Sequence, residues 1–500
     1  MKKRGELRPS PARLTEKYIF ALLVLFPLFV GFKGYVETTV SKFVFFAGLT
    51  LLWLALTAVR LRRSDLSGEK SPVFVLIGAY FALCAVSAIC SPYGAAVFFG
   101  EGRFDGIITS SLCVAVFFGA ALLGKPREKY LRWGIIAGAL CCVVGVLQLL
   151  GFNPLWFFPG EYDYYDAGVK YTGSFFGTIG NADLMSAYLC LLLPIGVGYY
   201  IIAARREPWL LPLLALFGFS FLTCGVSAGL LACGVTALFL PPLLITGGER
   251  LRRGLECAAV LALALCLALC FHGEKTDGSV CLSLRFSGKA AVMLILAVFA
   301  LLARLFFRRS EFEPRELRIF LISLSAVTAL GALAWVYFLP PESGTLWELS
   351  EVLHGNIRES FGSSRIRIWR QVLELFEERP LLGAGPGTLA KRMQLEFSRF
   401  VPETGATLTA FIDNAHNVYL GILADTGLLS LLCYVSAQVL SAALALRRGG
   451  GAALCLLLGL ICYWIQDFFG LGLFLVSPLM WLCWGLLVSE LCKPKTKDAD

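Results

Sequence analysis

The chain has 500 residues, of which 57% are hydrophobic and only 16% are charged, a balance that excludes a soluble globular protein. The net charge of +9 would suit a nucleic-acid-binding protein. However, the Lys and Arg residues form short clusters between apolar runs, where they orient helices in a membrane. The 17 cysteines form no C-x-x-C pair and lie almost all inside apolar runs. We therefore expect buried thiols, with neither a disulfide framework nor a metal site.

Apolar runs long enough to cross a bilayer recur along the whole chain, since one helical span needs about 20 residues. They fall near residues 18–33, 40–59, 72–90, 106–124, 132–151, 183–203, 208–223, 227–246, 254–271, 288–306, 317–338, 416–446, 452–469 and 472–491. The sequence therefore predicts an all-α polytopic membrane protein with about 12–14 transmembrane helices.

The connections between these runs alternate in charge. Most of the 44 Lys and Arg residues lie in the two tails and in every second connection, namely 60–70, 125–132, 205–206, 250–253, 304–318 and 447–448. Because cytoplasmic loops are enriched in Lys and Arg, the pattern predicts cytoplasmic N- and C-termini. The expected location is the bacterial cytoplasmic (inner) membrane.

This topology divides the chain into four parts. Residues 1–338 form a transmembrane bundle of about eleven spans, and 339–415 form a large extracytoplasmic loop with candidate catalytic elements. Residues 416–491 return as C-terminal transmembrane helices, and 492–500 form a cytoplasmic tail. A second outer connection, 152–182, is also long enough to fold.

The loop segment 363–379 is predicted to be an amphipathic helix, because Ile366, Trp369, Leu373 and Phe376 recur at helical spacing. A basic amphipathic helix with Trp on its apolar face is expected to lie along the membrane surface. Packing against the spans, with the charges merely solvated, is the alternative.

The next segment, Pro380–Gly387, reads PLLGAGPG and is too rich in glycine for a helix. Glycines at alternate positions allow several backbone N–H groups to converge on an anion. The same residues also suit a simple turn, so both interpretations stay open.

The loop returns to the membrane through Asp413-Asn-Ala-His416-Asn417, and only three histidines exist in the chain. A His-Asn pair at the start of a span is costly to desolvate unless it is used or paired. Imidazole titrates near pH 6.5, so His416 could accept a proton. A hydrogen-bonded histidine at the membrane interface is the alternative.

Arginines stand out in the segments that the topology places outside. They are Arg103, Arg358, Arg365, Arg367 and Arg370. Guanidinium groups bind phosphate through paired hydrogen bonds, so these positions indicate an anionic ligand. Phospholipid headgroups would explain some of them equally well.

Several of these residues form a pattern that resembles the O-antigen ligase and polysaccharide polymerase superfamily. The strongest part spans about 360–430 and consists of Arg365-x-x-x-Trp369, Pro380-Leu-Leu-Gly-x-Gly-x-Gly387, His416-Asn417-x-Tyr-Leu420 and Asp425-Thr-Gly427-Leu. Weaker matches are Arg103-Phe-Asp-Gly106 and Gly177-Thr-Ile-Gly-Asn181.

The resemblance implies a GT-C-like membrane fold and a metal-independent, inverting glycosyltransferase without a cofactor. Its donor would be a glycan linked to undecaprenyl diphosphate, and its acceptor a hydroxyl group outside the cytoplasmic membrane. The implied catalytic residues are His416 and Arg365. The implied substrate-binding residues are Arg103, Asn417, Arg367, Arg370 and Arg285.

One departure from the family pattern concerns phosphate binding. Ser227-Ala228-Gly229 stands where family members often have Ser-Arg-Gly. The phosphate role of that arginine is then vacant or taken by another residue, such as Arg285 or Lys289.

The expected partners are a lipid-linked glycan donor, an acceptor and membrane lipids, with no nucleic acid. The acceptor stays open between lipid A core, a growing polysaccharide, a teichoic-type polymer and a protein hydroxyl. A transporter or flippase of lipid-linked saccharides is the alternative function. Its usual mid-membrane ionisable groups would be Asp183, Asp425 and Asp467. A structural role in envelope assembly would leave His416 and Arg365 without a function.

Overall fold

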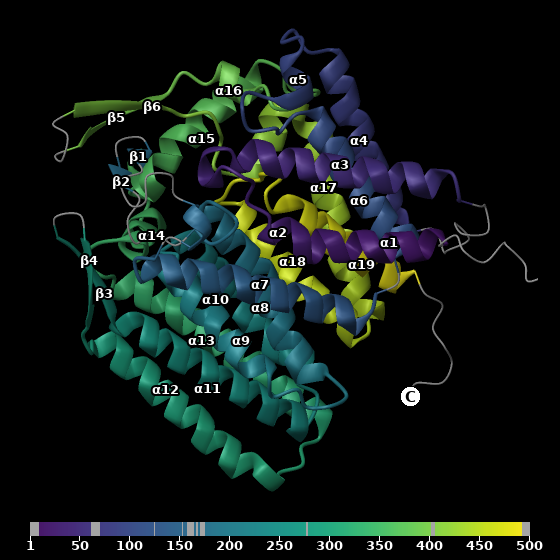
Figure 1. Cartoon of the computed structure of the whole chain (residues 1–500). Coiled ribbons are helices and arrows are strands. Elements are labelled where there is room, and N and C mark those ends of the chain that lie inside the picture. The colour runs from purple at the N-terminus through teal and green to yellow at the C-terminus, as the bar shows by residue number, and fades with distance from the viewer. Residues whose placement is uncertain are drawn as a thin grey trace, which may run out of the picture.

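The computed structural model describes residues 10–61, 71–124, 126–152, 154–157, 165–166, 169–170, 176–276, 279–401 and 406–492, and most of them are helical (Figure 1). The helices before the long connection are α1 Pro11–Phe20, α2 Phe26–Leu28, α3 Thr38–Ala58, α4 Pro72–Ile89, α5 Ala96–Phe99, α6 Ile107–Leu123, α7 Glu128–Leu149, α8 Ala182–Ile202, α9 Leu210–Thr223, α10 Ser227–Leu244, α11 Gly248–Cys270, α12 Gly288–Phe306 and α13 Pro314–Phe338. The remaining helices are α14 Thr345–Leu353, α15 Phe361–Glu377, α16 Leu389–Arg392, α17 Val418–Arg448, α18 Gly451–Asp467 and α19 Ser477–Leu491.

The described strands form three antiparallel hairpins. They are β1 Tyr165–Asp166 with β2 Val169–Lys170, β3 Phe271–Thr276 with β4 Ser279–Leu284, and β5 Glu396–Val401 with β6 Ala406–Phe411. All three hairpins lie on the left of the molecule in Figure 1, away from α1.

The predicted all-α polytopic architecture is confirmed. Nine helical segments in the described part of the chain are long and apolar enough to cross a membrane, and four further apolar helices are shorter. The long segments are α3, α4, α7, α8, α10, α11, α12 with the turn after it, α13 and α17, and the shorter ones are α6, α9, α18 and α19.

The first predicted span begins and ends earlier than expected. A continuous helical segment runs from Pro11 through a π-helical turn at residues 21–25 to Leu28. It starts early because Ser10 caps it and Pro11 suits the first helical turn. It stops early because Phe29 has extended backbone angles.

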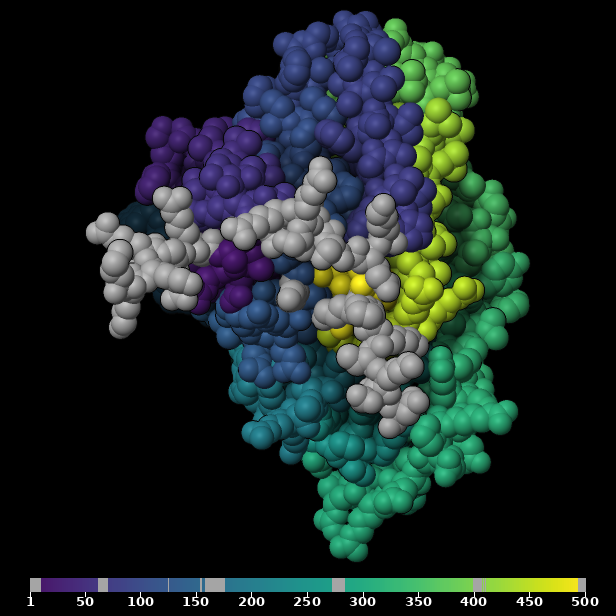
Figure 2. Space-filling model, turned by 90° about the vertical axis from the view of Figure 1, so that its right-hand side faces the viewer, coloured from purple at the N-terminus to yellow at the C-terminus, as the bar shows by residue number. Residues whose placement is uncertain are grey.

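The core of the bundle is α8, since 94% of its most apolar 18-residue stretch is buried. Glycines allow its neighbours to approach closely: a Cβ at Gly459 on α18 would lie 2.5 Å from the backbone oxygen of Leu191. By contrast, only 17% and 11% of the corresponding stretches of α12 and α13 are buried. In Figure 2 the teal and green part of the chain that holds these helices forms the lower edge of the molecule.

The long connection between α13 and α17 gathers at one end of the bundle, which we call the loop end. There it meets the connection between α4 and α6, since Ser91 Oγ donates to the Ala384 carbonyl at 2.5 Å. It also meets the start of α10, because Thr345 Oγ1 donates to Ser227 Oγ at 3.3 Å.

The basic connections meet at the opposite end, which we call the basic end. Their ion pairs join different helices there, as in Arg127–Glu16, Arg132–Glu207, Arg206–Glu256 and Arg304–Glu256. The charge alternation in the sequence therefore corresponds to two physically separate ends of the bundle.

The predicted amphipathic helix is α15, and it packs on α17, but its buried face differs from the predicted one. Ile368 and Val372 are buried in a small cluster with Leu389, Met393, Ala415 and Ala424. Leu373, which was expected on the apolar face, is exposed, because the helix is turned so that its 368/372 side meets α17. Its regular part begins near Arg365, because residues 362–364 have left-handed backbone angles.

Several predicted segments lie partly outside the described residues. They include most of the basic connection 60–70, much of the connection 152–182 and the tail 492–500, of which only Cys492 is described. Most of the cysteines whose side chains the structure describes are buried, and the buried ones are free thiols.

Candidate functional site

The segment that leads into α17 has a constrained backbone. His416 has a φ of 48°, a left-handed conformation that is unusual for a residue with a side chain. Its N–H donates to Asn414 Oδ1 at 2.9 Å. Asn417 is 2% exposed and caps α17, since its Oδ1 accepts the N–H of Leu420 at 3.0 Å.

Trp369 connects α15 to this segment. Its indole N–H donates to the carbonyl of Ala415 at 3.1 Å, directly before His416. Its ring contacts Phe468 edge-on at a centroid distance of 5.6 Å. Because Arg365 lies four residues earlier on α15, it shares the helix face that Trp369 directs toward this segment.

Arg365 retains unused hydrogen-bond donors. Its Nη1 donates to the Gly362 carbonyl at 2.8 Å. Its Nε is buried and has no partner within the described residues. A buried guanidinium nitrogen without a partner is a costly arrangement, and it suits a site that receives an anion.

A second arginine is held by a carboxylate. Arg103 Nε and Nη2 donate to the two oxygens of Asp413 at 2.5 and 2.7 Å, and about a third of each side chain is exposed. This bidentate pair joins the connection before α6 to the segment before α17.

The imidazole of His416 is half-buried, and neither ring nitrogen has a hydrogen-bond partner within the described part of the chain. Burial lowers the pKa of His416, and the charges of Arg365 and Arg103 lower it further, whereas Asp183 and Asp413 oppose them. His416 is therefore mainly neutral at neutral pH, the state that accepts a proton.

The structure brings Arg103, Arg365, His416 and Asn417 together, but not the other expected site residues. Arg367 is exposed and lies over the ring of Phe397 at 5.5 Å. The exposed Arg370 pairs with Glu359, and Arg285 is exposed in the connection between β4 and α12.

Two carboxylates near His416 were not expected from the sequence. Asp413 is hydrogen-bonded to Arg103, and Asp183 in the first turn of α8 is close enough to act electrostatically on His416. Asp413 lies just before the His416-Asn417 motif and Asp183 just after Gly177–Asn181, so only their closeness to these motifs could have indicated them from the sequence.

The backbone N–H groups of the glycine-rich segment Pro380–Gly387 donate to Asp425 of the protein itself. The N–H of Gly387 donates to Asp425 Oδ2 at 3.0 Å, and the N–H of Gly385 donates to the Asp425 carbonyl at 2.8 Å. Gly427 has a φ of 84° and kinks α17, which leaves the N–H of Leu428 to donate to the Pro380 carbonyl at 2.9 Å. These N–H groups therefore fix the kinked helix and are not free for a phosphate.

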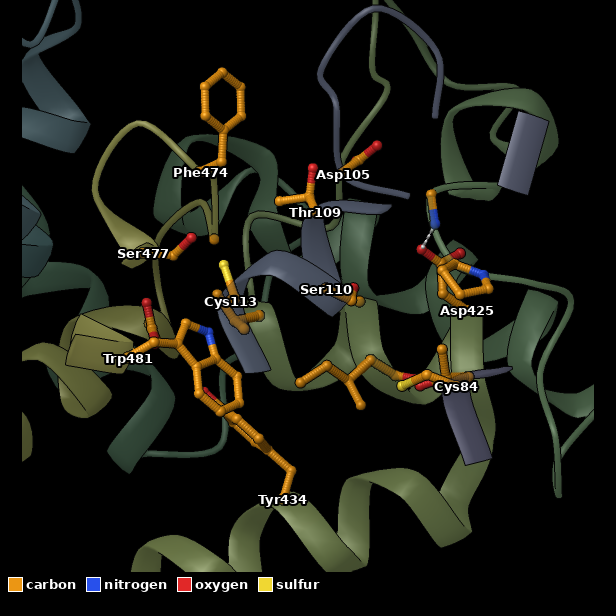
Figure 3. Close-up of a pocket in the computed structure, with 18 of the residues that line it drawn as sticks. Cys84, Asp105, Thr109, Ser110, Cys113, Asp425, Tyr434, Phe474, Ser477 and Trp481 are labelled. Atoms are coloured by element: carbon orange, nitrogen blue, oxygen red, sulfur yellow. Dashed lines mark hydrogen bonds between the residues drawn. The ribbon is translucent and has the colours of Figure 1, made fainter. Parts of the chain in front are cut away.

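A cavity of about 160 Å³ lies beneath the loop end, between α4, α6, α17, α18 and α19 (Figure 3). Asn414 and Asn417, which flank His416, both line it. Three carboxyl groups also line it, those of Asp105, Asp425 and Asp467. Burial raises the pKa of Asp105, which lies outside the spans.

Two further observations concern a possible metal ion and the position of Ala228. Among the described residues, no group of three or more His, Cys, Asp or Glu side chains is placed to hold a metal ion. Ala228, where the family often has arginine, lies in the first turn of α10 beside Ser227.

This chain is similar to a solved structure and to the model of a protein family. The archaeal oligosaccharyltransferase AglB from Archaeoglobus fulgidus, in complex with an inhibitory peptide and a dolichol-phosphate, is 14% identical over 90% of this chain and 50% of that chain, with a TM-score of 0.27. This chain thus spans about half of that structure, and at this TM-score the GT-C-like fold stays a prediction.

None of the curated proteins compared with this chain matches it. The model of one family, described as O-antigen ligase, matches residues 186–435, which is half of the chain. That segment includes Arg365, Trp369 and His416. The chain therefore belongs to the O-antigen ligase family.

Proposed function

We propose that this protein transfers a glycan from undecaprenyl diphosphate to an acceptor hydroxyl on the outer side of the bacterial cytoplasmic membrane. One observation carries the proposal. A mainly neutral imidazole without a partner, His416, lies beside a guanidinium with unused donors, Arg365, in a member of the O-antigen ligase family.

In this proposal the arginines bind the diphosphate of the donor. Arg365 offers its free Nε, and Arg103 adds positive charge while Asp413 holds it in place. Negative charge develops on the leaving phosphate oxygen as the bond to the anomeric carbon breaks. Preorganised guanidinium groups stabilise that charge and supply the role that a metal ion has in other enzymes. Arg367 and Arg370 are not part of the proposed site, because Arg367 lies over the ring of Phe397 and Arg370 pairs with Glu359.

His416 is the proposed general base. The acceptor oxygen gives its proton to the imidazole and forms a bond to the anomeric carbon from the face opposite the diphosphate. The carbon–oxygen bond to the diphosphate breaks, and its electron pair leaves on the phosphate oxygen. Configuration at the anomeric carbon is therefore inverted.

The charge distribution supports the proposed orientation. The basic end fits the cytoplasmic side, because Lys and Arg are retained there during insertion. The helical segment from Pro11 begins at this end, where Arg127 pairs with Glu16, and α19 ends there, where Ser489 Oγ donates to the Gly124 carbonyl at 2.6 Å. Both termini are then cytoplasmic, and the loop end faces outward.

Cysteine labelling tests this orientation, since residues 339–415 contain no cysteine. Glu342→Cys in a Cys90→Ser background should react with a membrane-impermeant maleimide on intact cells or spheroplasts. Labelling only after the membrane is opened would refute an outward loop end, and with it the proposed site.

The role of His416 is tested by His416→Ala, with His354→Ala as the matched control. His354 lies in the same connection, but its ring stacks on Tyr337 at 4.2 Å. Loss of a general base typically costs about 10²–10⁴-fold in rate. Transfer by His416→Ala at the rate of the control, with equal membrane abundance, would remove His416 from the mechanism.

The role of Arg365 is tested by comparing Arg365→Ala and Arg365→Lys with Arg367→Ala. Lysine keeps the charge but loses the planar fork, so we expect partial activity for Arg365→Lys and the larger loss for Arg365→Ala. Arg367→Ala should stay near the wild-type rate because that guanidinium is exposed on another face of α15. Equal rates for all three variants would contradict the assignment.

A further inference from the structure

The cavity beneath the loop end has an unusual charge balance. Three carboxyl groups line it, from the connection before α6, from α17 and from α18. Among the described residues that line it, none is Lys, Arg or His. The cavity therefore offers oxygen acceptors to a ligand but no positively charged group.

Several buried polar atoms of this lining have no partner. Asp467 is 2% exposed and Tyr463 is 1% exposed. Asp467 Oδ1, the Tyr463 hydroxyl and Asp105 Oδ1 all lack a hydrogen bond within the described residues. A buried polar atom without a partner costs free energy. These atoms therefore call for water or for a ligand that both donates and accepts.

The lining also presents aromatic side chains. Figure 3 shows Trp481 and Phe474 on one side of the cavity and Asp425 on the other, with Thr109, Ser110 and Cys113 between them. Aromatic rings offer flat apolar contact surfaces, whereas carboxyl and hydroxyl groups bind O–H groups. A ligand with an apolar C–H face and a ring of hydroxyl groups satisfies both kinds of lining.

Charge and size restrict the ligand further. None of the described residues that line the cavity is a cation that could pair with a diphosphate, which therefore fits the arginines and not this cavity. The described residues contain no group of side chains that would hold a metal ion. The volume of about 160 Å³ accommodates about ten water-sized groups at roughly 15 Å³ each. That is comparable with one sugar ring.

We propose that this cavity binds an uncharged saccharide unit of the acceptor. The proposal rests on the proposed function, and it places the charged part of the donor and the uncharged acceptor sugar at different sites. The diphosphate of the donor meets Arg365 and Arg103, and the acceptor sugar enters the acidic cavity. The segment from Asp413 to Asn417 separates the two regions, and both asparagines that flank His416 line the cavity. An acceptor held there has its hydroxyl groups beside the proposed base.

Saturation-transfer NMR on the purified full-length protein tests saccharide binding without any need for activity. The probes are the methyl glycosides of glucose, galactose, mannose and N-acetylglucosamine at millimolar concentration. Tyr463→Phe removes one hydroxyl group from the cavity and Asp467→Asn removes one carboxylate. Tyr188→Phe is the matched control, because Tyr188 is also 1% exposed with an unpartnered hydroxyl but does not line the cavity.

We expect at least one glycoside to bind the wild type and the control equally. Its affinity should fall about five- to tenfold in Tyr463→Phe and at least as much in Asp467→Asn. Binding should persist in His416→Ala, which separates the cavity from the catalytic proposal. Absence of binding by every glycoside, or equal binding by all variants, would overturn the inference.

A second arm identifies the source of the bound sugar. Membranes that contain lipid-linked donor are incubated with the glycoside that binds. If the cavity is the acceptor site, the wild type should glycosylate this probe and His416→Ala should not. A glycoside that binds and inhibits transfer but is never glycosylated would assign the cavity to the donor glycan and refute the acceptor assignment.

Discussion

Replacing Trp369 by phenylalanine tests whether α15 positions His416. The substitution removes the indole N–H that donates to Ala415 at 3.1 Å but keeps an aromatic ring against Phe468. Ala415 is 1% exposed, so water does not replace the lost donor. An unsatisfied buried carbonyl costs about 1–3 kcal/mol. The next residue, His416, already holds a left-handed conformation, which costs about 1–2 kcal/mol without supporting contacts.

If the full cost falls on the transition state, transfer slows by about 5-fold to 150-fold, since about 1.4 kcal/mol corresponds to tenfold. The assay is glycan transfer by membranes with matched protein abundance. The control is Trp347→Phe, because the Trp347 indole N–H has no hydrogen bond within the described residues. A wild-type rate for Trp369→Phe would refute the idea that this bond positions His416.

Three further predictions concern the charge of His416 and the glycine-rich segment. In a pH–rate profile, the rate of transfer should fall at low pH as His416 takes up a proton. Arg365→Gln should shift this fall to higher pH, because removing a positive charge raises the pKa of the imidazole. An unchanged profile for the residual activity of Arg365→Gln would contradict the coupling between the two residues. Gly387→Ala should lower the thermal stability of the purified protein more than Gly94→Ala. Both glycines have positive φ, but only at Gly387 would a Cβ meet other atoms, at 2.9 Å from Asp105 Oδ1; equal losses would show that steric contact is unimportant there. Asp425→Ala should cost about 1–3 kcal/mol of unfolding free energy, because the Gly387 N–H loses its acceptor. Asp425→Asn should cost less, and the reverse order in denaturant unfolding would rule out this bond as the reason.

The membrane architecture followed from the sequence because each span is a local property. An apolar run of sufficient length forms a helix in a bilayer whatever its neighbours are. The early start at Pro11 was missed because residues 11–17 are largely polar, whereas the capping by Ser10 depends on a single side chain.

The site was only partly predictable. The spacing of Arg365 and Trp369 on one helix face is encoded locally, and His416 stood out as a rare histidine at the start of a span. The pairing of Arg103 with Asp413 joins residues far apart in the chain, and nothing in either segment alone specifies it. The partner of the glycine-rich segment was not predictable either. An anion was one of two interpretations for its N–H groups, but nothing in the segment indicated Asp425 on α17 as the acceptor.

The acidic cavity was beyond prediction for the same reason. Its lining comes from five helices, α4, α6, α17, α18 and α19, and from loop residues outside them. In the sequence, Asp425 stood out as part of a family motif, and both Asp425 and Asp467 stood out as two of the few ionisable groups within spans.

Reconstitution of the purified protein in liposomes tests the central claim most directly. Lipid-linked glycan and an acceptor are supplied on both sides, and the covalent product and the movement of the lipid-linked glycan across the bilayer are measured separately. We expect the wild type to form a glycan–acceptor bond with release of the diphosphate lipid, and His416→Ala and Arg365→Ala to lose that product. Movement of intact lipid-linked glycan without a new covalent bond would contradict glycosyl transfer and favour a flippase.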